Sequence, residues 1–142
     1  MNIDSIRNGV VLDHIQAGKS MEIYRYLRFN ELDCSVAIIK NARSARLGKK
    51  DIIKIDSPMD LDLDVLGYID PDITVNLIRD GVRVEKKHLE LPEKIVNVIH
   101  CRNPRCITME EPQLDAVFLL SDPERRAYRC AYCDTPSDKK QF

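Results

Sequence analysis

Four cysteines near the end of the chain are the residues whose type and spacing most clearly predict chemistry. Cys101 and Cys106 form one close pair, and Cys130 and Cys133 form a second pair farther along. Two such pairs can hold a single ion in tetrahedral sulfur coordination, each pair from a tight loop. Because the fourth sulfur leaves no position open for water, the sequence predicts one structural zinc ion and not a catalytic one.

Other uses of these thiols remain open at this stage. An iron–sulfur or rubredoxin-like iron centre also takes cysteine ligands, and the cysteines could instead form disulfides. Cys34 stands apart from both pairs, before an apolar segment, and we interpret it as a small buried hydrophobic residue. We predict no catalytic residues, because His88 and His100 lack a nearby nucleophile with a third orienting group.

The length of the chain, 142 residues, allows one domain or two small ones. The metal would tie together only the last third of the chain. A segment of about 50 residues buries too little apolar surface to fold securely without such a cross-link. We therefore predict two domains, residues 1–91 and residues 92–142, joined by a short linker around residues 89–92.

The charge of the chain is nearly balanced, with 22 lysines and arginines against 23 aspartates and glutamates. Neither predicted domain has the strong positive field that non-specific binding to nucleic acid needs. The sequence also shows no signal-peptide pattern and no apolar run of about twenty residues. We therefore expect a soluble, cytoplasmic protein without nucleic-acid or membrane partners, in a compartment where reduced thiols suit metal binding.

The first predicted domain alternates strands with helices. Runs that are rich in β-branched residues, or that alternate apolar with polar residues, predict strands at residues 9–15, 35–40, 49–56, 73–79 and 82–86. Residues 41–48 are polar and end in glycine, which predicts a loop. Asp80 and Gly81 instead predict a tight hairpin turn between the last two strands.

Two helices are predicted between these strands. The first covers residues 20–29, where apolar side chains share one face. The second starts with Ser57 as N-cap and Pro58 at the first helical position, and its apolar stripe ends at Ile69. This order of elements predicts an α+β fold. The first domain would be a ferredoxin-like α/β sandwich, an antiparallel sheet with two helices whose last strand is an added hairpin arm.

The second predicted domain is a small antiparallel β zinc-binding domain. Its strands are predicted at residues 95–100, 117–120 and 127–130, the last leading into the second cysteine pair. Residues 134–142 are polar and without periodicity, which predicts a loose tail.

Polar residues at strand ends of the first domain predict a second site. Asp13 and His14 close the first strand, Lys54 lies on the third, and Lys86 or Lys87 ends the hairpin's second arm. If the sheet brings these together, the set suits a nucleoside triphosphate, with lysines on the phosphates and with Asp13 and Asn76 on the ribose or base. The alternative is that the lysines are solvated and protect a sheet edge, since the chain has no glycine-rich phosphate loop.

Five segments together resemble one known family. They are G-V-V-L-D-H-I, K-K-D-I-I-K-I, I-T-V-N-L-I, L-P-E-K-I-V-N-V, and C-x4-C with a distant C-x2-C. In this order, and over nearly the whole chain, they resemble the regulatory chain of aspartate carbamoyltransferase. The combination is far more specific than any single segment.

The resemblance implies a non-catalytic subunit that controls pyrimidine biosynthesis. In that family the first domain binds ATP, CTP and related nucleotides as allosteric effectors, the zinc domain docks on the catalytic chain, and regulatory homodimers bridge catalytic trimers. The positions matching the family's effector site are Ile6, Val11, Asp13, His14, Lys54, Asn76, Ile78 and Lys86. Those matching its contact with the catalytic chain are Asn103, Arg105 and Asp134.

The chain departs from the better-known members at three positions, two on the hairpin and one in the first cysteine loop. Gly81 and Arg83 stand where those members carry an aromatic and an aliphatic residue near the base, so Arg83 can add a phosphate contact instead. Arg105 replaces a second amide at the contact with the catalytic chain. The alternative function is a zinc-ribbon nucleic-acid-binding module, which predicts clustered basic residues with aromatic residues for stacking.

Overall fold

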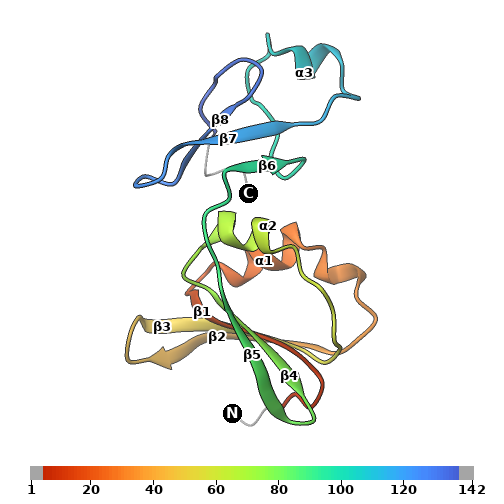
Figure 1. Cartoon of the computed structure of the whole chain (residues 1–142), viewed down its shortest axis with the longest axis vertical. Helices are drawn as coiled ribbons and strands as arrows, with labels where there is room; N and C mark the ends of the chain where they lie inside the picture. The colour runs from red at the N-terminus through yellow and green to blue at the C-terminus, as the bar shows by residue number, and fades with distance from the viewer. Residues whose placement is uncertain (1–4, 138–142) are drawn as a thin grey trace. The chain divides into compact units, whose positions relative to one another are not determined.

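The computed structural model of the chain describes residues 5–137. The chain divides into two compact units, Met1–Glu90 and Leu91–Phe142, and each has its own antiparallel sheet (Figure 1). Among the described residues, no helix has the length and apolar character that crossing a membrane would require.

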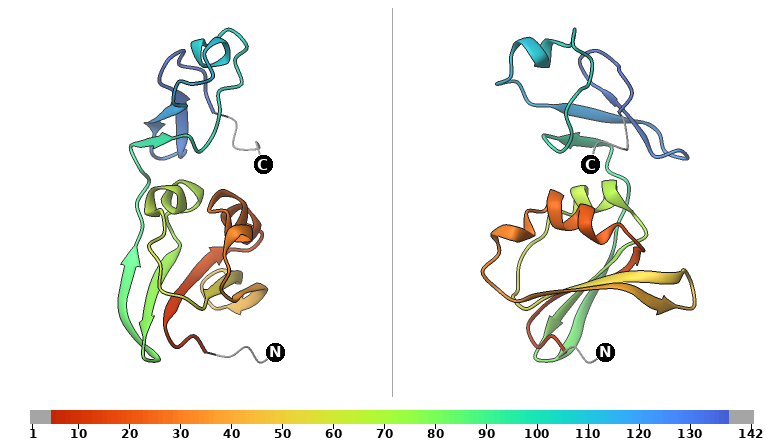
Figure 2. Two further views of the ribbon diagram at one scale, coloured as in Figure 1. Left: turned by 90° about the vertical axis from the view of Figure 1, so that its right-hand side faces the viewer. Right: turned by 180° about the vertical axis from the view of Figure 1, so that it is seen from behind.

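The first unit is built on a five-stranded sheet. Its strands are β1 (Gly9–Gln16), β2 (Val36–Ser44), β3 (Gly48–Ile55), β4 (Thr74–Arg79) and β5 (Val82–His88). They lie in the order β2-β3-β1-β4-β5, and every neighbouring pair is antiparallel. Helices α1 (Ser20–Tyr26) and α2 (Leu63–Ile69) lie on the same side of this sheet (Figure 2). Each helix connects two strands with a third between them, so the predicted ferredoxin-like α+β fold is confirmed.

The core of the first unit lies between the sheet and these two helices. Leu12 on β1 pairs with Ile53 on β3 and with Val75 on β4, and all three side chains are buried. Ile23 of α1 and Leu66 of α2 are fully buried as well. Because side chains alternate along a strand, the residues between these apolar ones fall on the opposite face of the sheet. No helix of the described chain lies over that face (Figure 2).

The second helix begins later than the sequence predicts. Its N-cap is Asp62, whose carboxylate accepts hydrogen bonds from the amides of Asp64 (3.1 Å) and Val65 (3.2 Å). The predicted cap, Ser57, instead donates its hydroxyl to the carbonyl of Pro58 at 3.4 Å. The prediction of a helix from Ser57 is therefore wrong, because an aspartate that satisfies two free amides is the stronger cap.

The predicted loop at residues 41–48 is largely strand. β2 continues to Ser44, and β3 already begins at Gly48, so the two form a long hairpin. Its register shifts between Ile39 and Ala42, where Asn41 takes a φ of 60°. After the bulge, polar residues continue the strand pairing while their side chains lie in solvent. Their polar composition predicted a loop because it gives no sign of this pairing. The hairpin turn at Asp80 and Gly81 is confirmed, since both residues have positive φ.

The first predicted helix also ends early. α1 stops at Tyr26, and Arg28 takes a φ of 55° before a short 3-10 helix, η1 (Phe29–Glu31). Phe29 is buried and packs edge-on against Tyr24. The apolar spacing that predicted one longer helix therefore belongs to two short segments that share the core.

Asp51 holds three parts of the first unit together. Its side chain is fully buried, and its carboxylate accepts hydrogen bonds from the hydroxyl of Ser20 (2.6 Å) and the amides of Asn41 (3.0 Å) and Gly18 (3.1 Å). Burial raises the pKa of Asp51, but these hydrogen bonds together outweigh burial and hold the pKa below its ordinary value of 3.8. The ionised carboxylate thus fixes the β1–α1 turn and the bulge of β2 against β3.

We expect Asp51→Asn to destabilise the first unit by about 2 kcal/mol at neutral pH, because an amide cannot accept all three hydrogen bonds. A lowered pKa stabilises the fold above the unfolded value of 3.8, and this stabilisation is lost as pH falls through the folded value. The difference between variant and wild type should therefore shrink in acid. Urea unfolding at pH 7 and pH 3, followed at resolved amide signals of β1 and β3, measures it. A difference that is equal at both pH values would contradict the role of the ionised carboxylate.

The second unit is a three-stranded sheet with one short helix. β6 (Lys94–Val96), β7 (Val117–Asp122) and β8 (Ala127–Cys130) lie in that order, and α3 (Ile107–Glu110) follows the first cysteine pair. Ile95, Phe118 and Tyr128 form its buried centre. The Tyr128 hydroxyl donates to the carbonyl of Pro92 at 2.6 Å, which satisfies the polar end of a buried ring.

Two predictions for this unit are corrected. The strand predicted at residues 95–100 ends at Val96, because Asn97 takes a φ of 59° and its side chain accepts a hydrogen bond from the amide of Ala116. The predicted loose tail is ordered over residues 134–137. There the amide of Ser137 donates to the carbonyl of Tyr128, and that of Cys130 donates to the carbonyl of Thr135. Residues 138–142 lie outside the described part of the chain.

Candidate functional site

The four cysteines of the second unit come together as the sequence predicts. The sulfurs of Cys101, Cys106, Cys130 and Cys133 all lie within 4.8 Å of one another. Two of the distances are 3.5 Å, between Cys101 and Cys133, and 3.8 Å, between Cys106 and Cys130. Sulfurs that bind one zinc at about 2.3 Å in a tetrahedron lie about 3.8 Å apart, so the cluster fits that ion. A disulfide requires about 2.05 Å, which these separations exclude.

The electrostatics of the cluster also suit a cation. Burial raises the pKa of the Cys101 thiol to about 12. A hydrogen bond from the hydroxyl of Thr135 to the sulfur of Cys133, at 3.1 Å, lowers the pKa of Cys133 to about 6. Metal ligation needs thiolates, and a buried thiolate needs a positive charge beside it. A divalent ion supplies that charge, and with four sulfur ligands it would have no open position for chemistry.

The loop between the first two cysteines is held by Asn103. The side-chain Nδ2 of Asn103 donates to the hydroxyl of Thr135 at 3.2 Å. Its side-chain Oδ1 accepts a hydrogen bond from the backbone amide of Arg105 at 3.0 Å. A further hydroxyl, from Thr108, donates to the sulfur of Cys106 at 3.1 Å. The sequence analysis missed Thr108 and Thr135, although each stands two residues after a cysteine, where a hydroxyl can reach the sulfur.

On the open face of the first sheet, four of the predicted effector residues lie in one row. Lys54 on β3 pairs with Val11 on β1, Val11 pairs with Asn76 on β4, and Asn76 pairs with Lys86 on β5. Paired residues in adjacent strands share a face, and strands lie about 4.8 Å apart. The two lysines therefore lie on one face with Val11 and Asn76 between them. Lys87 pairs with Val75 on the helix-covered face, which leaves Lys86 as the candidate residue of the two.

Asp13 and His14 lie beside this row, at the bulge of β1. They do not close the strand as predicted, because β1 continues to Gln16. Asp13 pairs with Lys50 at 2.9 Å, and His14 Nδ1 lies 3.1 Å from the hydroxyl of Thr74. Burial raises the pKa of Asp13, but hydrogen bonds from Lys50 and from the amide of His14, with the charge of Lys50, lower it below the ordinary value. The sequence analysis missed Lys50. It stands four residues before Lys54 on the same strand, and the period of two would have placed both on one face.

Asn76 carries an unsatisfied polar atom at the middle of the row. Its side chain is only 8% exposed, and its amide nitrogen donates to the carbonyl of Val11 at 3.3 Å. Its Oδ1 has no hydrogen-bond partner in the described part of the chain. A buried acceptor without a donor is unfavourable by about 1 to 3 kcal/mol, so a hydroxyl or amino group of a ligand would be stabilised here.

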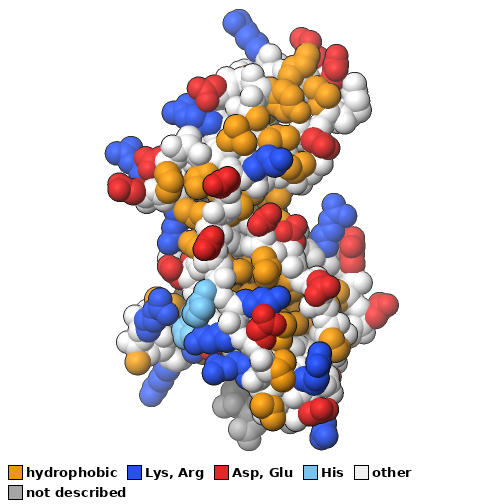
Figure 3. Space-filling view, in the orientation of Figure 1, with side chains coloured by type: hydrophobic (Ala, Val, Ile, Leu, Met, Phe, Trp, Pro, Cys, Tyr) orange, Lys and Arg blue, Asp and Glu red, His pale blue; other side chains and the backbone are white. Residues whose placement is uncertain are grey.

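The remaining predicted effector residues flank the row. Ile78 pairs with Gly9 on β1 and with Arg83 on β5, two positions along from Asn76. Ile6 lies toward β2 and β3, where it lines a hollow of about 270 Å³ together with Ala37 and Lys54. Basic and histidine side chains lie next to one another on one face of this unit (Figure 3).

Both units match known domain families over nearly their whole lengths. Residues 1–90 match the family described as "Aspartate carbamoyltransferase regulatory chain, allosteric domain", and residues 93–142 match its "metal binding domain". The chain belongs to the family of aspartate carbamoyltransferase regulatory chains. The resemblance found in its sequence is thereby confirmed.

Curated relatives agree over almost the whole length of this regulatory chain. Each carries the name "Aspartate carbamoyltransferase regulatory chain". The relative from Clostridium botulinum is 53% identical over 134 residues, which cover 94% of this chain and 92% of the relative. The relative from Clostridium tetani is 50% identical, with 94% of both chains covered. The relative from Bifidobacterium longum is 48% identical, with 94% and 96% covered.

This regulatory chain is a non-catalytic subunit with an allosteric domain and a metal-binding domain. A regulatory chain associates with a catalytic chain. The four-cysteine cluster of its metal-binding domain fits one structural zinc ion.

The residues predicted to contact the catalytic chain lie around the metal cluster. Arg105 and Asp134 are exposed, whereas Asn103 is half-buried because its side chain holds the first cysteine loop. Asp134 takes a φ of 64°, and its carbonyl accepts a hydrogen bond from Arg129 at 3.0 Å. Exposed apolar side chains lie near these residues, at Ile107, Met109 and Tyr132.

Proposed function

We propose that the allosteric domain of this chain binds nucleoside triphosphates, ATP and CTP among them, and so transmits allosteric control of pyrimidine biosynthesis to the catalytic chains in the cytoplasm. The effector residues would be Ile6, Val11, Asp13, His14, Lys54, Asn76, Ile78 and Lys86. The observation that carries the proposal is the row of Lys54, Val11, Asn76 and Lys86 on a sheet face that no helix covers.

Each part of a nucleotide has a suitable group on this face. Lys54 and Lys86 offer two ammonium charges to the phosphates as point charges. Asp13, already ionised beside Lys50, accepts hydrogen bonds from ribose hydroxyls. The free Oδ1 of Asn76 accepts a further hydrogen bond from a sugar hydroxyl or a base amino group. Arg83 on β5 pairs with Ile78 on β4 and is exposed, where it can reach an additional phosphate oxygen.

The metal-binding domain would carry the contact with the catalytic chain. Asn103, Arg105 and Asp134 would touch it, and regulatory homodimers would bridge catalytic trimers. A nucleotide can change a distant active site only if its affinity differs between two quaternary states, typically by about 1 to 3 kcal/mol. ATP and CTP would compete for one pocket and favour opposite states.

A role in nucleic-acid binding has less support. Of the aromatic residues near the metal cluster, Tyr128 and Phe118 are almost fully buried in the core, which leaves Tyr132 as the exposed ring for stacking. Together with the balanced charge of the chain, this favours a protein partner for the metal-binding domain.

Reconstitution tests the proposed function. The chain is mixed with its catalytic trimer, assembly is verified by size, and formation of carbamoyl aspartate is assayed with and without ATP and CTP. We expect the two nucleotides to shift activity in opposite directions, and a complex with the Lys86→Ala chain to respond more weakly. Unchanged kinetics in a verified complex would refute nucleotide control, although the chain would still connect catalytic trimers.

A further inference from the structure

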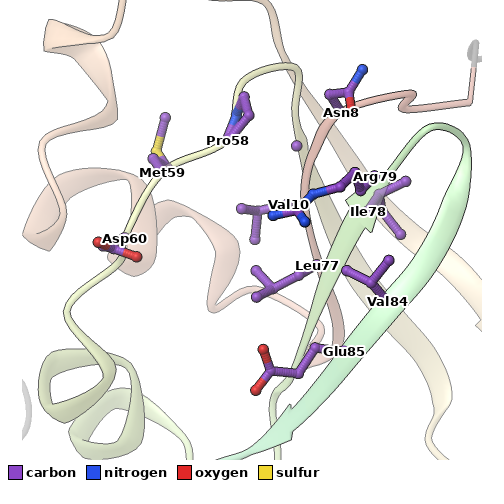
Figure 4. Close-up of a pocket in the computed structure, with 11 residues that line it drawn as sticks. Asn8, Val10, Pro58, Met59, Asp60, Leu77, Ile78, Arg79, Val84 and Glu85 are labelled. Carbon is purple, nitrogen blue, oxygen red and sulfur yellow. The ribbon is translucent and has the colours of Figure 1, made fainter.

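The β4–β5 hairpin borders a second cavity on the face opposite the proposed effector row. It has a volume of about 520 Å³ and lies between β4 and β5 on one side and residues 58–60 on the other (Figure 4). We call it the hairpin pocket. Leu77 and Glu85 line it and are register partners, next to Asn76 and Lys86 on the opposite face. Because side chains alternate along each strand, the hairpin pocket and the four residues of the proposed effector row use different side chains of β4 and β5. Ile78, which flanks the row, also lines the pocket.

The hairpin pocket has an apolar floor with opposite charges around it. Val10 and Leu77 form the floor, and Arg79 and Glu85 extend from the neighbouring strands toward residues 58–60, where Asp60 stands (Figure 4). Within residues 5–137, the side chains of these three charged residues have no hydrogen bond or ion pair. One guanidinium and two carboxylates therefore stand around an apolar surface, exposed to water and available to a ligand.

One wall of the hairpin pocket is free to adjust. No backbone-to-backbone hydrogen bond joins residues 58–61 to the rest of the described chain. Below this segment a smaller hollow, of about 40 Å³, continues the apolar floor toward Leu61, Leu63 and Val75. A segment without backbone pairing can shift at little energetic cost. An aliphatic group that enters below it would meet mainly apolar side chains, with Asp60 and Lys87 beside them.

We propose that the hairpin pocket binds a small zwitterion with an aliphatic side chain, of the class of apolar α-amino acids. The carboxylate lies on the guanidinium of Arg79, which suits it as a planar fork of donors. The ammonium lies with Glu85 and Asp60, and the aliphatic side chain covers Val10 and Leu77. The carboxylates of Glu85 and Asp60 would repel the phosphates of a nucleotide, so the hairpin pocket suits a different class of ligand. The proposal therefore does not depend on nucleotide binding at the effector row.

L-Leucine is the probe, and the full chain is titrated with it while backbone amide signals are followed by NMR. We expect saturable shifts at Val10, Leu77 and Glu85, with roughly millimolar affinity, as small ligands with two ion pairs show. 4-Methylpentanoate lacks the ammonium and 3-methylbutylamine lacks the carboxylate, and each should bind at least about tenfold more weakly. Equal affinity for leucine and either analogue would overturn the proposal, as would the absence of saturable shifts.

Two variants test the assignment of the charges. Arg79→Gln and Glu85→Gln should each weaken leucine binding about tenfold, while Arg46→Gln, at an exposed position of the β2–β3 turn, should bind as the wild type does. The dispersion of the amide signals verifies that each variant is folded. Wild-type affinity in Arg79→Gln or Glu85→Gln, or the same loss in Arg46→Gln, would show that the ligand lies elsewhere.

Discussion

Replacing Cys106 by serine is expected to unfold the metal-binding domain and to leave the allosteric domain folded. Cys106 is 1% exposed and lies 3.8 Å from Cys130 in the sulfur cluster. A serine hydroxyl does not replace a thiolate ligand of zinc. The binding of a structural zinc contributes roughly 10 to 16 kcal/mol in small zinc domains, which exceeds what the short sheet around Phe118 and Tyr128 can supply alone.

Amide NMR spectra of the full chain separate the two domains and measure this outcome. Signals from residues 94–137 should lose their dispersion in Cys106→Ser, and metal analysis should show less than one zinc per chain. Chelation of the wild type should give the same spectrum. Cys34→Ser is the matched control, because Cys34 is half-buried and stands outside the cluster. An ordered metal-binding domain in Cys106→Ser, still bound to the catalytic trimer, would show that the ion is not what holds this domain.

The strands of the allosteric domain could be predicted because their signals are local. The residues of β1 and β3 are rich in β-branched side chains, and the turn at Asp80 and Gly81 needs the positive φ that those two residues tolerate. The metal ligands could be predicted for the same reason, since each cysteine pair lies in one short loop and the two pairs together can coordinate one ion.

The differences arise where a choice between two local caps, or a contact between separate segments, decides the structure. The late start of α2 depends on Asp62, which outcompetes Ser57 as a cap. The long β2–β3 hairpin depends on a bulge at Asn41 whose amide is held by Asp51, ten residues away. Residues 134–137 become ordered through the carbonyl and amide groups of β8, which no periodicity reveals.

The effector face shows most clearly what sequence alone leaves open. Lys54, Asn76 and Lys86 could be named from the sequence, but their common row follows from the strand order and the register. A shift of any strand by one residue would move its side chain to the helix-covered face. The same register explains why Lys86 and not Lys87 lies in the row of the proposed site, and it gives the control for the prediction that follows.

Lys54→Ala and Lys86→Ala are each expected to weaken nucleotide binding by roughly 10- to 100-fold. A hydrogen bond to a charged group contributes about 1.5 to 3 kcal/mol, and each lysine stands at one end of the row with a free ammonium group in the described structure. Lys87→Ala is the matched control. It removes the same charge from the adjacent position of β5 but on the face that pairs with Val75, away from the row.

Calorimetric titration of the full chain with ATP and with CTP, at low and at high salt, measures these affinities. The loss in Lys54→Ala and Lys86→Ala should shrink as salt rises, because added ions screen the attraction between ammonium and phosphate. Assembly with the catalytic trimer should persist in both variants, since the proposed contact lies on the other domain. If Lys87→Ala weakens binding as much as Lys86→Ala does, the effect comes from net charge and not from the row. Wild-type affinity in both row variants would place the nucleotide on another surface of the allosteric domain.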